Sequence, residues 1–158
     1  HVEIPDGGAE GVLIAHGDAT SGYSLYIKDG RLVHDLNIGG GHEIVTSDRK
    51  ILSGARRLGV HVERLLRKEP PAKGSRTGIT AYTLLIDGEP VGSIQTQMGF
   101  NNFISWSGLD IGRDRSSPVS HYEAPFEFTG QLLRVTVDMH ADQKLDGEGI
   151  AAAEMARQ

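Results

Sequence analysis

Two Asp-Gly pairs, at positions 29–30 and 87–88, constrain the fold of this chain more than any other feature of its sequence. Each pair stands between two short runs in which β-branched or aromatic residues alternate with polar ones. Asp-Gly between such runs is the strongest short-range signal for a β-hairpin, because a type I′ turn needs two residues that tolerate a positive φ. The sequence therefore predicts two antiparallel hairpins, formed by residues 23–27 with 32–37 and by residues 79–86 with 90–94.

The same alternation recurs along most of the chain and predicts a fold made of short strands. Glycine accounts for 21 of the 158 residues, about twice the usual frequency, and the glycine cluster at 39–41 predicts a break between strands. No helical pattern separates the strands, so a parallel α/β sheet is not expected. Residues 68–77 and 113–123 are expected to form loops. Further strands are predicted at residues 1–4, 11–16, 42–47, 56–67, 103–106, 109–112 and 126–139.

These features predict an all-β chain that folds as an antiparallel β-sandwich of the jelly-roll or concanavalin-like type. We expect the sandwich to occupy residues 1–140 and residues 141–158 to form a separate tail. Residues 151–157 of this tail are rich in Ala, with Glu, Met and Arg, which favour a helix. A short C-terminal helix is therefore predicted. Because so short a helix is marginal in water, it is expected to dock on another surface.

Charge and composition exclude several classes of function. The chain has 16 basic and 21 acidic residues, a net charge of −5 and a pI near 5.8, whereas binding to nucleic acid or to an anionic membrane needs a basic patch. No apolar stretch approaches the roughly 20 residues of a membrane-spanning helix. The chain has no cysteine, which excludes disulfides, a cysteine nucleophile and thiolate metal ligands. We therefore expect neither a nucleic-acid nor a membrane partner.

Histidines are numerous enough to raise the question of a metal site. No two of them have the HxH or HExxH spacing that brings imidazoles together on one strand or helix. We therefore interpret them as separate strand and loop residues, and predict no metal ligand among them. The seven histidines are His1, His16, His34, His42, His61, His121 and His140.

The sequence gives still weaker signals for a calcium site, a phosphate-binding loop or a catalytic nucleophile. Asp110 and Asp114 lie near a predicted strand end and Asp87 at a turn, where oxygen ligands could hold calcium. Asp in such turns more often accepts backbone hydrogen bonds, and no EF-hand-like ligand series is present. The chain also lacks a phosphate-binding GxGxxG loop and a GxSxG nucleophile elbow. We therefore predict no catalytic, cofactor-binding or metal-binding residue in this chain.

Aromatic side chains offer one further possibility, stacking against the rings of sugars. The more common role of large aromatic side chains in a sandwich is to fill the core, and we favour that interpretation. The candidates are Tyr23, Tyr26, Tyr82, Phe100, Phe103, Trp106 and Tyr122.

Several segments, taken together, form a family pattern from about Glu3 to Met139. Its most specific block is LDIGRD at 109–114, followed by SPVS at 117–120, Tyr122 and APFEFTG at 124–130. LYIKDGRL at 25–32 and LLIDGEPVG at 84–92 contribute less, because laminin-G-like and concanavalin-like sandwiches share them. The pattern resembles the C-terminal region of bacterial arylsulfatases. Its other segments are residues 11–14, 22–24, 37, 46–48 and 52–54.

The resemblance implies a non-catalytic accessory domain. Family members hydrolyse sulfate esters with a formylglycine, made from a C/S-x-P-x-R motif, beside a divalent cation. Both belong to an α/β domain that precedes this region. The nearest approach to the motif here is residues 116–120, SSPVS, which has Ser120 where Arg is required. No catalytic residue is therefore carried over to this chain, and its implied partner is the catalytic sulfatase domain of the same polypeptide.

An alternative is a freestanding carbohydrate-binding module of the laminin-G or lectin type, with weak carbohydrate binding as its function. Fold by itself does not separate the two, because one fold serves many functions. The start of the chain within a strand pattern and its Ala-rich tail favour an accessory domain cut from a larger protein. For such a domain we expect an exposed apolar docking surface, formed by residues 100–106 and 150–155. A lectin would instead need a row of exposed aromatic rings or a bound calcium.

Overall fold

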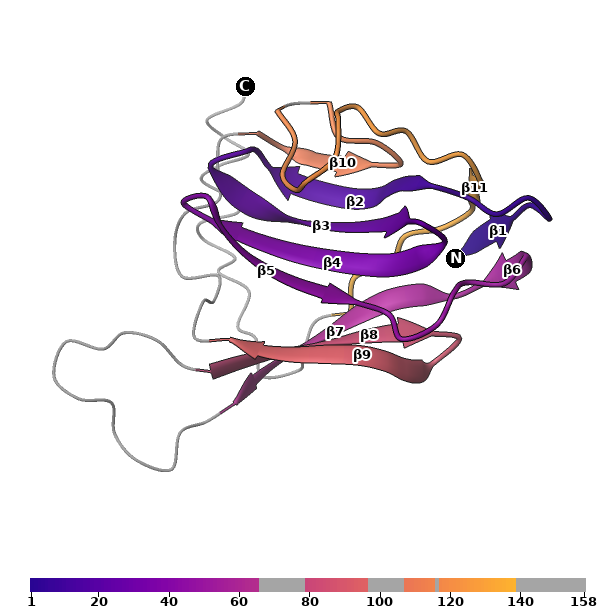
Figure 1. Cartoon of the computed structure of the whole chain (residues 1–158), viewed down its shortest axis with the longest axis horizontal. Helices are drawn as coiled ribbons and strands as arrows, with labels where there is room; N and C mark the ends of the chain where they lie inside the picture. The colour runs from indigo at the N-terminus through magenta and orange to yellow at the C-terminus, as the bar shows by residue number, and fades with distance from the viewer. Residues whose placement is uncertain (66–78, 97–106, 116, 139–158) are drawn as a thin grey trace, which may run out of the picture.

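The protein folds as an all-β sandwich, as Figure 1 shows for a computed structural model of the chain. The structure describes residues 1–65, 79–96, 107–115 and 117–138. Within these ranges it contains eleven strands in three antiparallel sheets and no helix. The predicted all-β class and the antiparallel sandwich are therefore confirmed. The predicted loop at 68–77, the strand at 103–106 and the helix at 151–157 lie outside the described residues.

The largest layer is a five-stranded sheet with the order β10-β2-β3-β4-β5. Its four long strands follow one another along the chain, so consecutive hairpins build it, and β10 joins at the free edge of β2. The register of β2 against β3 shifts at a bulge between Val12 and Ile14. The strands are β2 (Gly11–Gly17), β3 (Ser21–Lys28), β4 (Arg31–Ile38), β5 (Gly41–Thr46) and β10 (Leu109–Ile111).

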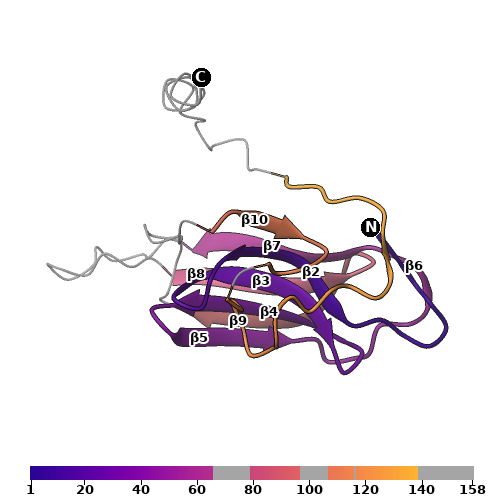
Figure 2. The ribbon, with the colours of Figure 1, turned by 90° about the horizontal axis from the view of Figure 1, so that it is seen from above.

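A three-stranded sheet with the order β7-β8-β9 forms the second layer (Figures 1 and 2). A small third sheet, β11-β1-β6, lies at the end of the sandwich where the N-terminus is. The strands of the second layer are β7 (Leu58–Leu65), β8 (Ile79–Ile86) and β9 (Glu89–Thr96). Those of the third are β1 (Val2–Ile4), β6 (Gly54–Arg56) and β11 (Gln131–Leu132).

Both predicted Asp-Gly hairpins are present. Asp29 and Gly30 have φ values of 54° and 70°, and Asp87 and Gly88 have values of 55° and 91°. Two consecutive positive φ values are the signature of the type I′ turn, whose twist matches that of the strands it joins. Consequently β3 pairs with β4 without interruption from Lys28↔Arg31 to Ser21↔Ile38. The glycines at 39–40 form a third turn of the same kind, between β4 and β5.

Apolar side chains bury on both faces of the five-stranded sheet. On the inner face, Leu25, Ile27 and Leu32 pack against Leu84 and Val91 of the second layer. On the outer face, a smaller cluster joins the sheet to the 112–130 connection. It consists of Val12, Ala15, Tyr26 and Val33 from the sheet and Val119 and Tyr122 from the connection, with Phe126 packed against them. The described residues of this connection, 112–115 and 117–130, form no strand, yet they cover one face of the sheet.

Two predicted strands need correction. The long strand at 126–139 is wrong within the described residues, because only β11 pairs there. Its partner β1 is only three residues long, and only Val2 and Glu3 pair with β11. Before β11, Gly130 passes so close to β1 that an added Cβ would lie 2.8 Å from the Glu3 carbonyl oxygen. The alternating pattern at 126–139 therefore forms a strand only at the two residues that have β1 beside them for pairing.

The predicted strand at 56–67 divides into β6 and β7, which belong to different sheets. The break falls at Arg57, whose N–H donates to Asp87 Oδ1 at 2.8 Å and whose carbonyl accepts from the Asp87 N–H at 2.7 Å. These bonds fix the start of β7 to the turn between β8 and β9. Residues 66–67 lie outside the described part of the chain.

Candidate functional site

On the outer face of the five-stranded sheet, several buried polar groups connect distant parts of the chain. Asn37 of β4 donates through Nδ2 to the carbonyl oxygens of Ala19 and Val119, at 3.0 Å each. The Tyr26 and Ser120 hydroxyls lie 3.1 Å apart. These contacts fix the 112–130 connection over β3 and β4.

Within this face, Asp35 and His42 form a hydrogen-bonded pair. Asp35 of β4 is fully buried, and its Oδ2 lies 2.7 Å from Nδ1 of His42 on β5. When Nδ1 of the neutral ring donates to this carboxylate, Nε2 is the ring nitrogen that keeps a lone pair. The His42 side chain is 18% exposed. The buried carboxylate therefore orients a ring that solvent can reach.

His121, from the 112–130 connection, completes this group. Its ring centroid lies 4.2 Å from that of His42, with the ring planes tilted by 37°. His121 is exposed, and its carbonyl oxygen accepts a hydrogen bond from Lys28 Nζ at 2.8 Å. We call Asp35, His42 and His121 the outer-face cluster.

Sequence reasoning missed the outer-face cluster because it searched for ligands close together in the chain. A two-residue turn at 39–40 places Asn37 opposite His42, and therefore puts Asp35 on the same face and diagonal to it. That half of the cluster could have been found from the hairpin register. His121 comes from a connection without regular structure, and no local pattern predicts where it lies.

The other described histidines do not join this group. His34 faces the inner core, where its ring stacks on Tyr82 with the centroids 4.9 Å apart. Burial lowers the pKa of His34 to about 4. His16 meets the edge of Tyr23, and His61 lies exposed on β7. His140 is outside the described residues, and among those described no group of three or more His, Asp or Glu side chains could hold a metal ion.

Two of the three carboxylates considered for calcium, Asp110 and Asp114, hydrogen-bond to residues of the 112–130 connection, and Asp87 bonds to Arg57. Asp114 Oδ2 accepts from the Val119 N–H at 3.0 Å and from the Tyr122 hydroxyl at 2.7 Å. Asp110 accepts from Arg115 through the backbone N–H at 2.7 Å and through Nε at 2.6 Å. Burial opposes ionisation of Asp110, but the hydrogen bonds and charge of Arg115 outweigh it and keep its pKa below the usual value. Both side chains therefore stabilise loop structure.

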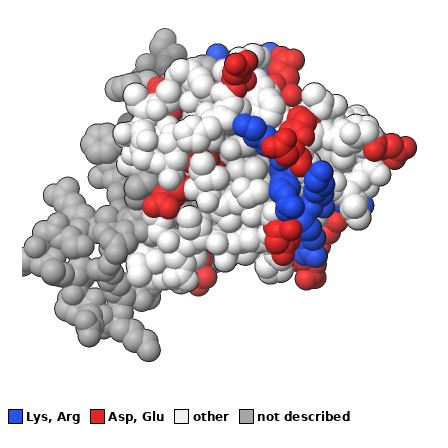
Figure 3. Space-filling view, viewed as in Figure 1, with Lys and Arg blue, Asp and Glu red and all other residues white. Residues whose placement is uncertain are grey.

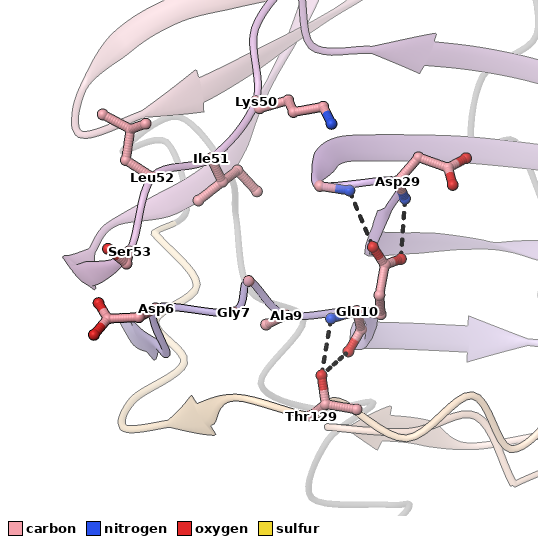
Figure 4. A pocket seen from close by; sticks show the side chains of 12 residues that line it. Asp6, Gly7, Ala9, Glu10, Asp29, Lys50, Ile51, Leu52, Ser53 and Thr129 are labelled. Carbon is pink, nitrogen blue, oxygen red and sulfur yellow. Dashed lines mark hydrogen bonds between the residues drawn. The ribbon is translucent and has the colours of Figure 1, made fainter.

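A shallow depression of about 780 Å³ lies at the end of the sandwich, lined by residues 6–10, 29–30, 50–53 and Thr129 (Figure 4). Glu10 lies on one side of it, and its carboxylate accepts from the backbone N–H groups of Asp29 and Gly30, at 3.0 Å each. Its own N–H donates to Thr129 Oγ1 at 2.9 Å. The carboxylate thus stabilises the β3–β4 turn. No nucleophile is hydrogen-bonded to a base among the described lining residues.

Surface charges are mixed rather than separated. In Figure 3 a band of Lys and Arg side chains is bordered by Asp and Glu side chains. Arg56 lies 3.3 Å from Asp87 and Arg49 lies 3.7 Å from Asp48. The described part of this face therefore shows no broad basic area of the kind that nucleic-acid binding needs.

None of the described aromatic side chains is fully exposed. Tyr26, Tyr82 and Tyr122 are buried, and Tyr23 is half-buried. Burial and the hydrogen bond to Asp114 raise the pKa of Tyr122 above its usual value. Tyr26, Tyr82 and Tyr122 fill core positions, as the sequence predicted. The other candidates for sugar stacking, at 100, 103 and 106, lie outside the described residues.

Comparison with known proteins found no matching family model, no matching curated protein and no matching solved structure. The described part of the chain also contains no helix that is long and apolar enough to cross a lipid bilayer.

Proposed function

We propose that this chain is a non-catalytic β-sandwich domain of an arylsulfatase-like hydrolase, which packs on and supports the catalytic domain of the same polypeptide. The observation that carries the docking role is the apolar segment after β11. Leu133, Val135 and Val137 are 56%, 38% and 72% exposed, and they alternate with polar residues. Apolar side chains repeated in this way on a surface are typical of an interface.

The backbone of this segment also has unused hydrogen-bonding capacity. The N–H groups of Leu133 and Arg134 donate to the His1 carbonyl, at 2.9 and 3.2 Å. From residue 135 to 138 the backbone forms no hydrogen bond with the backbone of any described residue. Figure 2 shows it as an open trace beside the sheets. A partner strand that packs on this segment would bury its apolar side chains and supply hydrogen-bond partners for its backbone.

The resemblance to sulfatases supplies the identity of that partner. Its most specific block coincides with β10 and the 112–130 connection, where Asp110 and Asp114 organise the loop through Arg115 and Tyr122. This gives the block a structural role, which is what an accessory domain requires. The formylglycine and divalent cation of the proposed parent enzyme would belong to its catalytic domain.

The first test is the gene sequence upstream of this chain. The proposal expects an α/β domain there with a C/S-x-P-x-R motif, and an upstream region of any other class would overturn it. The isolated chain is also expected not to release phenol from a chromogenic aryl sulfate, with or without calcium or magnesium. Turnover that disappears on mutation of a residue in this chain would contradict the non-catalytic role.

The docking role has its own test, in which the upstream domain and this chain are co-expressed and purified together. Val135→Lys combined with Val137→Lys should weaken the association, because two charges would have to be buried in the interface. Thr136→Lys, at an exposed polar position between them, is the matched control and should have a smaller effect. If the wild type, the double variant and Thr136→Lys all associate equally with the upstream domain, the interface lies elsewhere. Saturable binding of oligosaccharides by the chain would favour the lectin alternative.

A further inference from the structure

We propose that His42 and His121 together bind a divalent transition-metal ion such as Zn²⁺, with Asp35 holding His42 in the ligating orientation. This inference is independent of the sulfatase proposal. It rests on the meeting of two imidazoles that are far apart in the sequence, at a place that solvent reaches.

The first argument is the placement of the two rings. His42 lies on β5, a strand of the largest sheet, whereas His121 is exposed on the connection that covers this sheet. The ring centroids are 4.2 Å apart, and the proposed site requires the exposed His121 ring to rotate so that a nitrogen from each ring is directed at one ion. Two imidazoles at one exposed place are a typical start of a transition-metal site, because imidazole is a preferred ligand of Zn²⁺, Cu²⁺ and Ni²⁺.

The second argument is the buried carboxylate behind His42. Metal-binding histidines commonly donate their other ring N–H to a carboxylate, which fixes the tautomer and makes the ligating nitrogen more basic. The bond of 2.7 Å between Asp35 Oδ2 and His42 Nδ1 has this arrangement. It leaves Nε2 of His42 as the nitrogen with a free lone pair.

The third argument is the other oxygen of the same carboxylate. Asp35 Oδ1 is buried without a hydrogen-bond partner among the described residues. A buried and incompletely paired negative charge is costly, and a cation nearby reduces that cost. An ion on His42 would place positive charge one ring away from Asp35.

The ligand count defines the kind of site. Two imidazoles supply two protein ligands, and water would complete the coordination, so binding should be weaker and more exchangeable than in a closed four-ligand site. The ammonium group of Lys28, which donates to the His121 carbonyl, opposes a cation and further limits the affinity. Calcium and magnesium prefer oxygen ligands and should not compete.

The experiment is a calorimetric titration of the whole chain with Zn²⁺ at pH 7.5, combined with NMR spectra of the histidine ring nitrogens. We expect one Zn²⁺ per chain at the outer-face cluster, and shifts of the His42 and His121 resonances. His42→Gln and His121→Gln should each weaken this binding by roughly tenfold or more. Asp35→Asn should weaken it by about 10- to 100-fold, the range found when the partner of a ligating histidine is replaced.

The controls separate this site from simple surface binding. His121 is exposed, so His121→Gln tests the ligand role without disturbing the core. His61→Gln, at an exposed position on β7, should leave the affinity unchanged. Because an amino-terminal histidine can chelate metal by itself, His1→Ala is titrated in parallel and should retain the site. Excess Zn²⁺ that shifts neither His42 nor His121, or full affinity in both glutamine variants, would overturn the proposal.

Discussion

The buried imidazole of His34 makes the stability of this domain depend on pH in a defined window. The ring stacks on Tyr82 in the inner core and is 2% exposed. Burial lowers the pKa of His34 from 6.5 to about 4, because the charged form loses its hydration there. Its Nδ1 has no hydrogen-bond partner among the described residues. The native state therefore holds a neutral histidine.

The sign and size of the effect follow from linkage. Below pH 6.5 the unfolded chain takes up a proton on this side chain, whereas the native state does so only near pH 4. The stabilisation is thus complete above pH 6.5 and is lost progressively down to about pH 4. A difference of one pKa unit corresponds to about 1.4 kcal/mol, so the total loss from this one group is roughly 3 kcal/mol.

The assay is urea unfolding at a series of pH values from 7.5 to 4.5 for the wild type and His34→Phe. Phenylalanine keeps an aromatic ring against Tyr82 but neither titrates nor leaves a buried nitrogen unpaired, so its stability should fall less steeply below pH 6.5. At pH 7.5 the variant should be as stable as the wild type or more stable. His61→Phe makes the same replacement at an exposed position and should keep the wild-type slope. Equal slopes for the wild type and His34→Phe would refute the reasoning.

Three further predictions concern the turns, a buried hydroxyl and a loop carboxylate. Gly30→Val and Gly88→Val should each destabilise the domain by about 1–3 kcal/mol in thermal unfolding, because valine is strained at positive φ. Gly59→Val, in a strand with open space around it, is the control. Equal losses of stability in the control and the two turn variants would contradict the turn argument. Tyr82→Phe should be neutral or stabilising, since it removes a buried hydroxyl without a described partner; a large loss in urea unfolding would reveal a partner. Asp110→Asn should lower the thermal unfolding midpoint at pH 7 relative to the wild type. Because Arg115 lowers the pKa of Asp110 below its usual value of 3.8, the difference between the two midpoints should shrink as the pH falls below 3.8. A difference that persists in acid would exclude the ion pair as its cause.

Turn chemistry and alternation determined much of the fold from the sequence alone. A type I′ turn depends on two residues and the hydrogen bonds of their immediate neighbours, so Asp29-Gly30 and Asp87-Gly88 fixed both turns, and Asp29-Gly30 also fixed the register of β3 against β4. Beside Asp87-Gly88 the register of β8 against β9 shifts between Leu84 and Leu85, at an irregularity that the turn does not determine. The same local rules defined the β4–β5 hairpin and, within it, the pairing that places Asp35 near His42.

Only the tertiary structure decided the features that depend on a distant partner. Alternation put His34 and Asp35 on opposite faces of β4, but packing against Tyr82 determined that His34 faces the inner core. The apolar pattern around β11 was present in the sequence, yet the short partner β1 limited the strand to two residues. His121 meets His42 because an irregular connection folds back over the sheet. Such contacts depend on the packing of the whole chain, which no local pattern encodes.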